Sequence, residues 1–178
     1  MGMSMSSYGP FFHHGCVAWH IDCNDKFEAI RRIVYQSRVF EEIDGLDPNE
    51  FADIVIARER IQSTALGHGV AVAHGRSPKV EHPLVALGIS HEGIAFDSPD
   101  GQPVHLIFVV ANHPSQQVDY LSILSTVARL ARNPSFRNSL LCATGGLEAE
   151  HIFGQAFQER MEAQYALGRA MQARAGCA

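Results

Sequence analysis

A histidine close to several glycines is the feature of this sequence that could do chemistry. His74 ends an apolar run, 70–73, that is typical of a buried strand, and Gly75 follows it. Imidazole titrates closer to neutral pH than any other side chain, so a neutral His74 can act as a nucleophile. Two further glycines, Gly67 and Gly69, allow backbone N–H groups to approach an anion. Together these residues indicate a histidine that accepts a phosphoryl group.

Such a histidine needs donors for three phosphate oxygens and a ring held in one tautomer. Arg58 offers a planar fork of N–H donors near the end of a predicted helix that leads into the glycine-rich segment. Ser63 and Thr64 add hydroxyl donors. We expect backbone N–H groups of residues 67–69 to complete the phosphate site, with His68 as a further contact.

Each of these assignments has a structural alternative. A histidine at a strand end often only completes a hydrogen bond of the fold, and an arginine late in a helix often only faces solvent. His68 is equally well explained as an exposed residue of a loop. The residue types alone leave these alternatives open.

Hydrophobic periodicity, capping residues and turn residues predict the elements that position these side chains. Asn24 or Asp25 is expected to cap the first helix, and Asp47, followed by Pro48, to cap the second. The expected strands cover residues 17–21, 69–73, 84–90 and 104–111. The expected helices cover residues 26–40, a segment from 48 through 58, 115–131, 134–143, and a last segment from 147.

This order predicts an α/β fold: a single-domain three-layer sandwich in which helices flank a mixed sheet on both faces. The 178 residues suffice for one domain with a substantial core. We expect residues 1–15 to form a flexible N-terminal tail, 16–160 the domain, and 161–178 a helical extension or a tail. Phe153, Phe157, Met161 and Tyr165 recur at helical spacing, which indicates a packing face or a homodimer contact.

Composition narrows the class of protein. The net charge of −5 argues against a nucleic-acid partner. The longest apolar runs, 84–89 and 106–111, are too short to insert into a membrane. Four scattered cysteines favour a reducing cytoplasm over a disulfide scaffold. Because no glycine-rich nucleotide fingerprint occurs, we expect no cofactor.

The N-terminal region concentrates histidines and cysteines that could bind zinc or copper. Their spacing fits no common metal motif, and alternate residues of the predicted strand point to opposite faces. We therefore expect no metal site here and leave the role of the cluster open. Its members are His13, His14, Cys16, His20 and Cys23.

Two segments resemble a known family. Residues 57–75, ARERIQSTALGHGVAVAHG, resemble the signature of the type-2 enzyme IIA domain of the sugar phosphotransferase system (PTS), and residues 93–110 resemble the hairpin and strand that follow it. The likeness covers roughly residues 15–158 and is greatest to the nitrogen-regulatory branch. It implies an α/β sandwich with the active histidine at one edge of the sheet. It also implies that His74 takes phosphate, on Nε2, from the phosphocarrier HPr or its nitrogen-branch analogue, with Arg58 in the active site.

The sequence departs from the family pattern at three positions. Ala73 stands where the family has a proline, which restores a backbone N–H donor before the histidine. His68 stands where asparagine is frequent. Alignment places Tyr120 where many members have a second active-site histidine, and a tyrosine donates one hydrogen bond but offers no cation.

These observations predict a soluble IIA-like phosphocarrier, in the cytoplasm, and three roles remain open for it. In a regulatory role, phosphorylation would change what the protein binds, because it adds nearly two negative charges. In sugar transport, the protein would pass phosphate to a separate IIB. In the third role, it would be a degenerate binding module without transfer activity, an interpretation that Ala73 and Tyr120 support. Only the first two roles would make it a phosphotransferase component.

Overall fold

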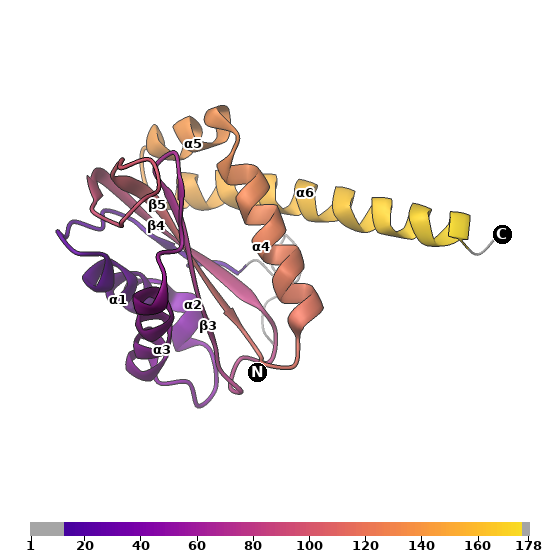
Figure 1. Ribbon diagram of the computed structural model, residues 1–178, viewed down its shortest axis with the longest axis horizontal. Coiled ribbons are helices and arrows are strands. Elements are labelled where there is room, and N and C mark those ends of the chain that lie inside the picture. Colours follow the sequence, from indigo (N-terminus) through magenta and orange to yellow (C-terminus); the bar gives the residue numbers. More distant parts are fainter. Residues whose placement is uncertain (1–12, 176–178) are drawn as a thin grey trace.

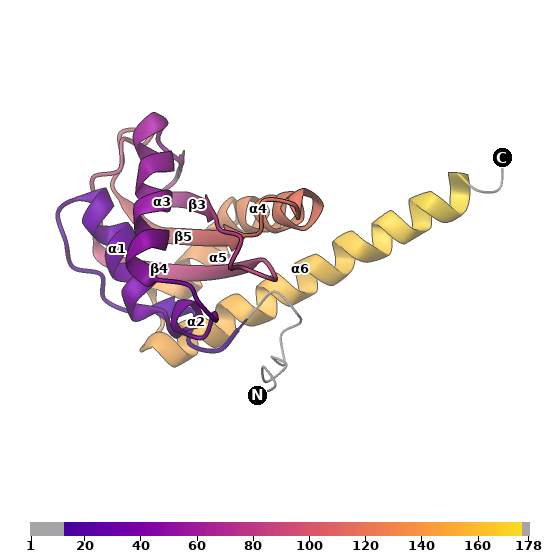
Figure 2. The ribbon, with the colours of Figure 1, turned by 90° about the horizontal axis from the view of Figure 1, so that it is seen from below.

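The computed structural model describes residues 13–175, with side chains to residue 168, and within this range a mixed five-stranded sheet lies between two layers of helices (Figures 1 and 2). The strand order is β1-β4-β5-β3-β2. The parallel pairs are β1 with β4 and β3 with β5, and the antiparallel pairs are β4 with β5 and β2 with β3. The strands are β1 Val17–Ala18, β2 Ala65–Gly67, β3 Val70–Arg76, β4 Leu84–Ile94 and β5 Val104–Asn112.

The helices that precede β2 lie on one side of the sheet and those that follow β5 lie on the other, as Figure 2 shows. The first group is α1 Lys26–Gln36, α2 Arg38–Glu41 and α3 Pro48–Ile61. The second group is α4 Gln117–Ala131, α5 Pro134–Leu141 and α6 Gly146–Ala175. The expected three-layer α/β sandwich with a mixed sheet is therefore confirmed.

The central strands are buried on both faces. Residues 84–89 of β4 and 106–111 of β5 are almost wholly shielded from solvent. A strand covered by helices on both sides has no polar face, so its apolar residues form a continuous run instead of alternating with polar ones. The two longest apolar runs of the sequence are thus explained by the sandwich.

Helix starts agree with the capping residues in the sequence. Asp25, rather than Asn24, caps α1, because its side chain accepts hydrogen bonds from the backbone N–H groups of Phe27 and Glu28. Asp47 caps α3 in the same way by accepting from Asn49 N, with Pro48 in the first turn. The second cap matters for function, because α3 carries Arg58.

Several element boundaries differ from the sequence prediction. The helix expected over 26–40 is interrupted at Ser37, whose backbone is extended and whose buried hydroxyl donates to Cys16 O over 3.4 Å. The strand expected over 17–21 has two residues, because His20 adopts a positive φ of 57° soon after it. Strand β2 was not expected. Strand β3 continues to Arg76, so His74 lies within the strand and not at a turn after it.

Helix α6 extends well beyond the body of the molecule (Figures 1 and 2). Phe153, Phe157 and Met161 are buried, whereas Tyr165 is partly exposed. The apolar face of α6 therefore packs on the core of its own chain over much of its length. In the described range, no helix combines the length and the apolarity that crossing a membrane requires. Residues 1–12 of the expected N-terminal tail lie outside the described range.

Candidate functional site

His74 lies near the carboxyl end of β3, where its partner in register is Val110 of β5. Side chains alternate between the two faces along a strand, so His74 and Arg76 share one face and Gly75 has the other. Gly75 faces α3, since a Cβ placed on it would lie 2.8 Å from Val55 Cγ2 and 3.1 Å from Phe51 Cε2. His74 and Arg76 therefore face the layer that contains α4.

Gly75 is explained by packing and not by phosphate binding. The contact of such a Cβ with Val55 would be closer than real Cβ atoms tolerate, so a larger residue would push α3 away from β3. The sequence analysis ended the predicted strand before Gly75, whereas in the structure this residue lies inside β3 and lets a helix approach.

Tyr120, from the first turns of α4, closes the site over His74. The ring centroids of His74 and Tyr120 are 5.7 Å apart. The guanidinium carbon of Arg76 lies 5.4 Å from the centroid of the same tyrosine ring. Only 5% of Tyr120 is exposed, which fixes the ring between the two neighbours. The residue that aligns with the family's second histidine thus does lie at the site.

A backbone carbonyl sets the tautomer of His74. The Nδ1 atom lies 3.3 Å from Val72 O. A carbonyl oxygen can only accept, so this contact assigns the ring proton to Nδ1 and leaves the lone pair on Nε2. The geometry is that of a nucleophilic Nε2, the nitrogen that the family resemblance implies.

The environment keeps His74 neutral. Burial, the largest cause, lowers the pKa of His74, and the charges of Arg58 and Arg76 lower it further. The hydrogen bond to Val72 O and the charge of Glu59 act in the opposite direction. The net result is a pKa below the ordinary value of 6.5. A depressed pKa means that the neutral, nucleophilic form dominates at neutral pH. Burial likewise raises the pKa of Tyr120, although Arg76 and Arg58 oppose the shift, so its hydroxyl stays protonated.

Arg58 is brought to the same site by α3. Its Nη1 donates to Gln62 O over 3.1 Å, across the carboxyl end of the helix. Its charge lowers the pKa values of both His74 and Tyr120. The ring contact joins His74 to Tyr120, and Arg58 lies close enough for its charge to act on both; all three were singled out in the sequence.

Ser63 and Thr64 lie beside the strand, but their hydroxyls are engaged in the fold. Ser63 Oγ donates to Phe96 O over 2.7 Å, and Thr64 Oγ1 donates to Glu59 Oε2 over 2.6 Å. Neither proton is directed to a phosphate near His74. This corrects the expectation of two hydroxyl donors and assigns both residues to ordering the segment after α3.

The glycine turn lies at the other end of β3. Gly67, His68 and Gly69 all adopt positive φ, between 56° and 84°, which glycine adopts most readily and which here turns β2 into β3. The N–H of His68 already donates to Asp100 Oδ2 over 2.7 Å. Because a strand rises about 3.3 Å per residue, Gly69 and His74 are about 17 Å apart. The structure does not bring these three residues to His74, which corrects their assignment to a phosphate site.

Glu59 is a residue of the site region that the sequence analysis missed. It is only 2% exposed, and its carboxylate accepts from Lys26 Nζ over 3.0 Å and from Thr64 N over 3.0 Å. Although burial alone would lower the pKa of Lys26, hydrogen bonds to Asp97 and Glu59 raise it. The position of Glu59 indicates burial, because it continues the helical spacing of Val55 and Ile56 toward the core.

Arg76 is the second missed residue. It follows His74 by two positions, and a strand of period two predicts that the two side chains share a face. That signal was present in the sequence, but it required β3 to continue past His74.

Other histidines and an acidic turn residue serve the fold. His105 Nδ1 lies 2.9 Å from Ser90 O, and His113 Nδ1 lies 2.7 Å from Ser115 Oγ. The pKa of Asp100 falls to about 2 because its carboxylate accepts hydrogen bonds from the Ser98 hydroxyl and from backbone N–H groups. These hydrogen bonds stabilise the turn that contains Asp100.

The N-terminal histidines and cysteines do not converge. His14 Nδ1 pairs with Glu150 Oε1 over 2.8 Å, Cys16 is buried, and His20 packs against Trp19 and His91 with ring centroids 5.1 Å apart. Among the described residues, no three His, Cys, Asp or Glu side chains are placed to hold a metal ion.

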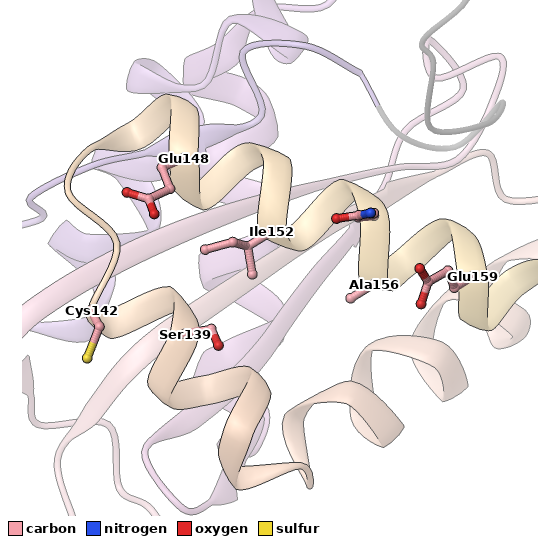
Figure 3. A pocket seen from close by; sticks show the side chains of 7 residues that line it. Ser139, Cys142, Glu148, Ile152, Ala156 and Glu159 are labelled. Carbon is pink, nitrogen blue, oxygen red and sulfur yellow. The ribbon is translucent and has the colours of Figure 1, made fainter.

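A hollow of about 480 Å³ lies between α5 and α6, away from the candidate site (Figure 3). Ile152 and Ala156 of α6 line it opposite Ser139 of α5, with Glu148 and Glu159 toward its ends. His74, Arg58, Arg76 and Tyr120 are not among its lining residues.

The fold and the site define a class: a small α/β sandwich with a histidine of lowered pKa near the end of a sheet strand, on which the charges of two arginines act. The chain belongs to the family described as the phosphoenolpyruvate-dependent sugar phosphotransferase system, EIIA 2, which matches residues 10–154. It is 31% identical, over 66% of its own length and 74% of the relative, to a nitrogen regulatory protein of Bradyrhizobium diazoefficiens.

Two solved structures share the fold. The nitrogen regulatory protein IIA-Ntr of Neisseria meningitidis aligns with a TM-score of 0.69 and 28% identity, over 78% of this chain and 92% of that one. Enzyme IIAMTL of Escherichia coli, solved in complex with phosphorylated enzyme IIBMTL, aligns with a TM-score of 0.63 and 19% identity, over 79% and 95% of the two chains. At that identity, the second likeness concerns the fold alone.

Proposed function

We propose that this chain is a PTS enzyme IIA phosphocarrier that accepts a phosphoryl group on Nε2 of His74 from an HPr-type phosphocarrier protein. The observation that carries the proposal is the His74 ring itself. Its pKa is lowered, which favours the neutral form, its Nδ1 lies 3.3 Å from Val72 O, and the charges of Arg58 and Arg76 act on it. Membership of the family supports the same chemistry.

The transfer balances without a cofactor. The Nε2 lone pair of His74 attacks the phosphorus of the donor's phosphohistidine, and a new N–P bond forms as the donor's N–P bond breaks. The electron pair of the broken bond returns to the donor's ring nitrogen. The Nδ1 proton of His74 remains directed at Val72 O throughout, and Arg58 offsets the negative charge on the phosphoryl oxygens.

For the role of the phosphorylated form, regulation by altered protein binding is our first proposal. Phosphorylation adds nearly two negative charges to a half-buried position, which is enough to change an interface. The similarity to proteins named as nitrogen regulatory proteins supports this role. We propose that residues 16–160 form the phosphocarrier domain and that residues 161–178 extend it. We also propose that the protein acts in the cytoplasm.

Transfer onward to a separate IIB protein is the second candidate. The relative enzyme IIAMTL was solved in complex with a phosphorylated IIB, and it shares the fold of this chain. The two roles share the first step on His74 and differ in whether the phosphate is then passed to another protein. A IIB that removes the phosphate from the loaded protein would favour the second role.

The test is phosphorylation in vitro with enzyme I, an HPr-type donor and phosphoenolpyruvate, followed by intact-mass measurement. We expect one acid-labile phosphate on the wild type and none on His74→Gln. His105→Gln is the matched control, because His105 also contacts a backbone carbonyl through Nδ1 but lies elsewhere on the sheet. A folded wild type that takes no phosphate from several such donors would contradict the proposal and favour the degenerate binding module.

A further inference from the structure

We propose that Arg76, held against the ring of Tyr120, supplies the positive charge at the phosphoryl group that a second histidine supplies in many members of the family. The inference rests on the proposed acceptor role of His74. It assigns Arg76 as a phosphate ligand and Tyr120 as the platform and hydrogen-bond donor beside it.

The strand geometry places the two groups together. Arg76 follows His74 by two positions on β3, so the side chains leave the same face, with their Cα atoms about 7 Å apart. An arginine side chain is long enough to span that distance to the ring of His74. A residue that contacts phosphate on Nε2 has to lie on this face, and the two nearest positions on it are Val72, which is buried and apolar, and Arg76, which is exposed.

Tyr120 links the two residues. The ring of His74 and the guanidinium of Arg76 both pack on Tyr120, at 5.7 and 5.4 Å from its centroid. A cation over a tyrosine face is attracted by the ring quadrupole, which holds the guanidinium near the histidine. Tyr120 is buried whereas Arg76 is exposed, so the cation stays at the surface where a phosphoryl donor would arrive.

The charge of Arg76 is available to an anion. Lys26, a largely shielded cation elsewhere in the fold, is paired with Glu59 and Asp97. No salt bridge between described residues includes Arg76 or Arg58. Both guanidinium groups act on His74 and on Tyr120, and they come from different elements, β3 and α3. Two such cations converging on one neutral nucleophile form an anion site without a second histidine.

The chemistry explains why tyrosine alone would not suffice. Its hydroxyl can donate one hydrogen bond, but it carries no positive charge. The guanidinium supplies charge and a fork of donors that matches phosphate oxygens. In this chain, the pair Tyr120 and Arg76 therefore divides the two contributions that one protonated histidine combines.

The test compares Arg76→Ala, Arg76→Lys, Tyr120→Phe and Arg129→Ala with the wild type. Arg129 is an exposed arginine of α4, so its removal changes net charge equally without touching the site. Each protein is phosphorylated by two donors: an HPr-type protein, and phosphoramidate, a small molecule that phosphorylates histidine without a protein interface. The rate of formation of the acid-labile adduct and its rate of loss at neutral pH are both measured by intact mass.

We expect Arg76→Ala to slow formation about 10- to 100-fold with both donors, the loss typical of one charge-assisted hydrogen bond. Arg76→Lys should recover part of the rate, Tyr120→Phe should cost a few-fold, and Arg129→Ala should match the wild type. Adding Tyr120→His to Arg76→Ala should restore formation, because the new imidazole can supply the missing cation.

Where the wild type is phosphorylated, two outcomes would overturn the inference. One is an Arg76→Ala protein that matches the wild type with both donors. The other is a loss confined to the protein donor, which would make Arg76 part of a docking surface. If the wild type takes phosphate from phosphoramidate but not from any HPr-type protein, the proposed function fails while the phosphoramidate arm still decides the role of Arg76. If neither donor modifies His74, both proposals fall.

Discussion

The two ends of strand β3 have similar residue types and different tasks. At its start, Gly67, His68 and Gly69 take positive φ values and turn the chain from β2 into β3. At its far end, His74 and Arg76 face Tyr120 from α4. Each end has a histidine next to glycine, yet only the far end has the partners of a phosphoryl-acceptor site.

The difference lies in what the polar groups already contact. At the turn end, the N–H of His68 donates to Asp100, whose carboxylate also accepts from Ser98 and Gln102. At the histidine end, the Nδ1 contact with Val72 O leaves the lone pair on Nε2 of His74, and the charges of Arg58 and Arg76 act on the ring. Saturated hydrogen bonds stabilise a turn, whereas unpaired charge and a free lone pair are needed to bind and accept an anion.

The largest effect is expected from Glu59→Ala, which frees the segment that runs beside β3 between its two ends. The substitution leaves Lys26 with the exposed Asp97 alone and removes the acceptor of Thr64 N and Oγ1. We expect a loss of about 3–5 kcal/mol in the free energy of unfolding, measured in urea, as for other broken buried ion pairs. Asp53→Ala, which removes an exposed pair with Arg31 on the same helix layer, should cost less than about 1 kcal/mol. Equal losses of unfolding free energy in the two variants would show that Glu59 does not hold the segment after α3 in place.

The second prediction compares how the two ends of β3 affect the rate of phosphorylation. Arg58→Ala should slow phosphorylation of His74 about 100-fold, the loss typical of removing one preorganised donor to a developing charge. His68→Ala should stay within about twofold, because its N–H bond to Asp100 does not involve the side chain and the position lies at the other end of the strand. A large loss of phosphorylation rate in His68→Ala would show that the glycine turn does contribute to the phosphate site.

The third prediction compares how glycine substitutions at the two ends of β3 affect the free energy of unfolding. Gly75→Ala should lower the free energy of unfolding by about 1–3 kcal/mol through overpacking against Val55 and Phe51. Gly69→Ala should cost about 1–2 kcal/mol for a different reason, its φ of 75°. Adding Val55→Ala should relieve part of the first cost and none of the second, which a double-mutant cycle measures. Coupling of Val55 to both glycines would contradict the packing explanation.

The smallest effect concerns pH. Because the pKa of folded His74 lies below its ordinary value of 6.5, the folded state resists protonation of this ring. The contribution of neutral His74 to stability is therefore complete above about pH 6.5 and is lost as pH falls through the lowered pKa. Histidine titration by NMR should show the depressed pKa in the wild type and a higher one in Arg58→Ala. A His74 that titrates at or above 6.5 would remove the electrostatic argument for a neutral nucleophile.

Local features of the sequence predicted a large part of the fold. Asp25 and Asp47 cap helices where capping preferences place them, and continuous apolar runs mark the buried strands. The break at Ser37 was not predicted, because a buried contact to Cys16 O, far away in sequence, stabilises it. The family of the chain and its likeness to the nitrogen-regulatory branch were also identified from motif residues and are confirmed.

By itself, the sequence determined the types of the elements, the family, and the histidine, arginine and tyrosine that meet at the site, because periodicity, caps and motif residues are properties of neighbours along the chain. Only the tertiary structure decided that β3 continues past His74 to Arg76, that Glu59 is buried against Lys26, and that Arg76 packs on Tyr120. These facts depend on where a strand ends, on its register with β5 and on how α3 and α4 cross the sheet. Each of them is set by packing between segments that lie far apart in the sequence.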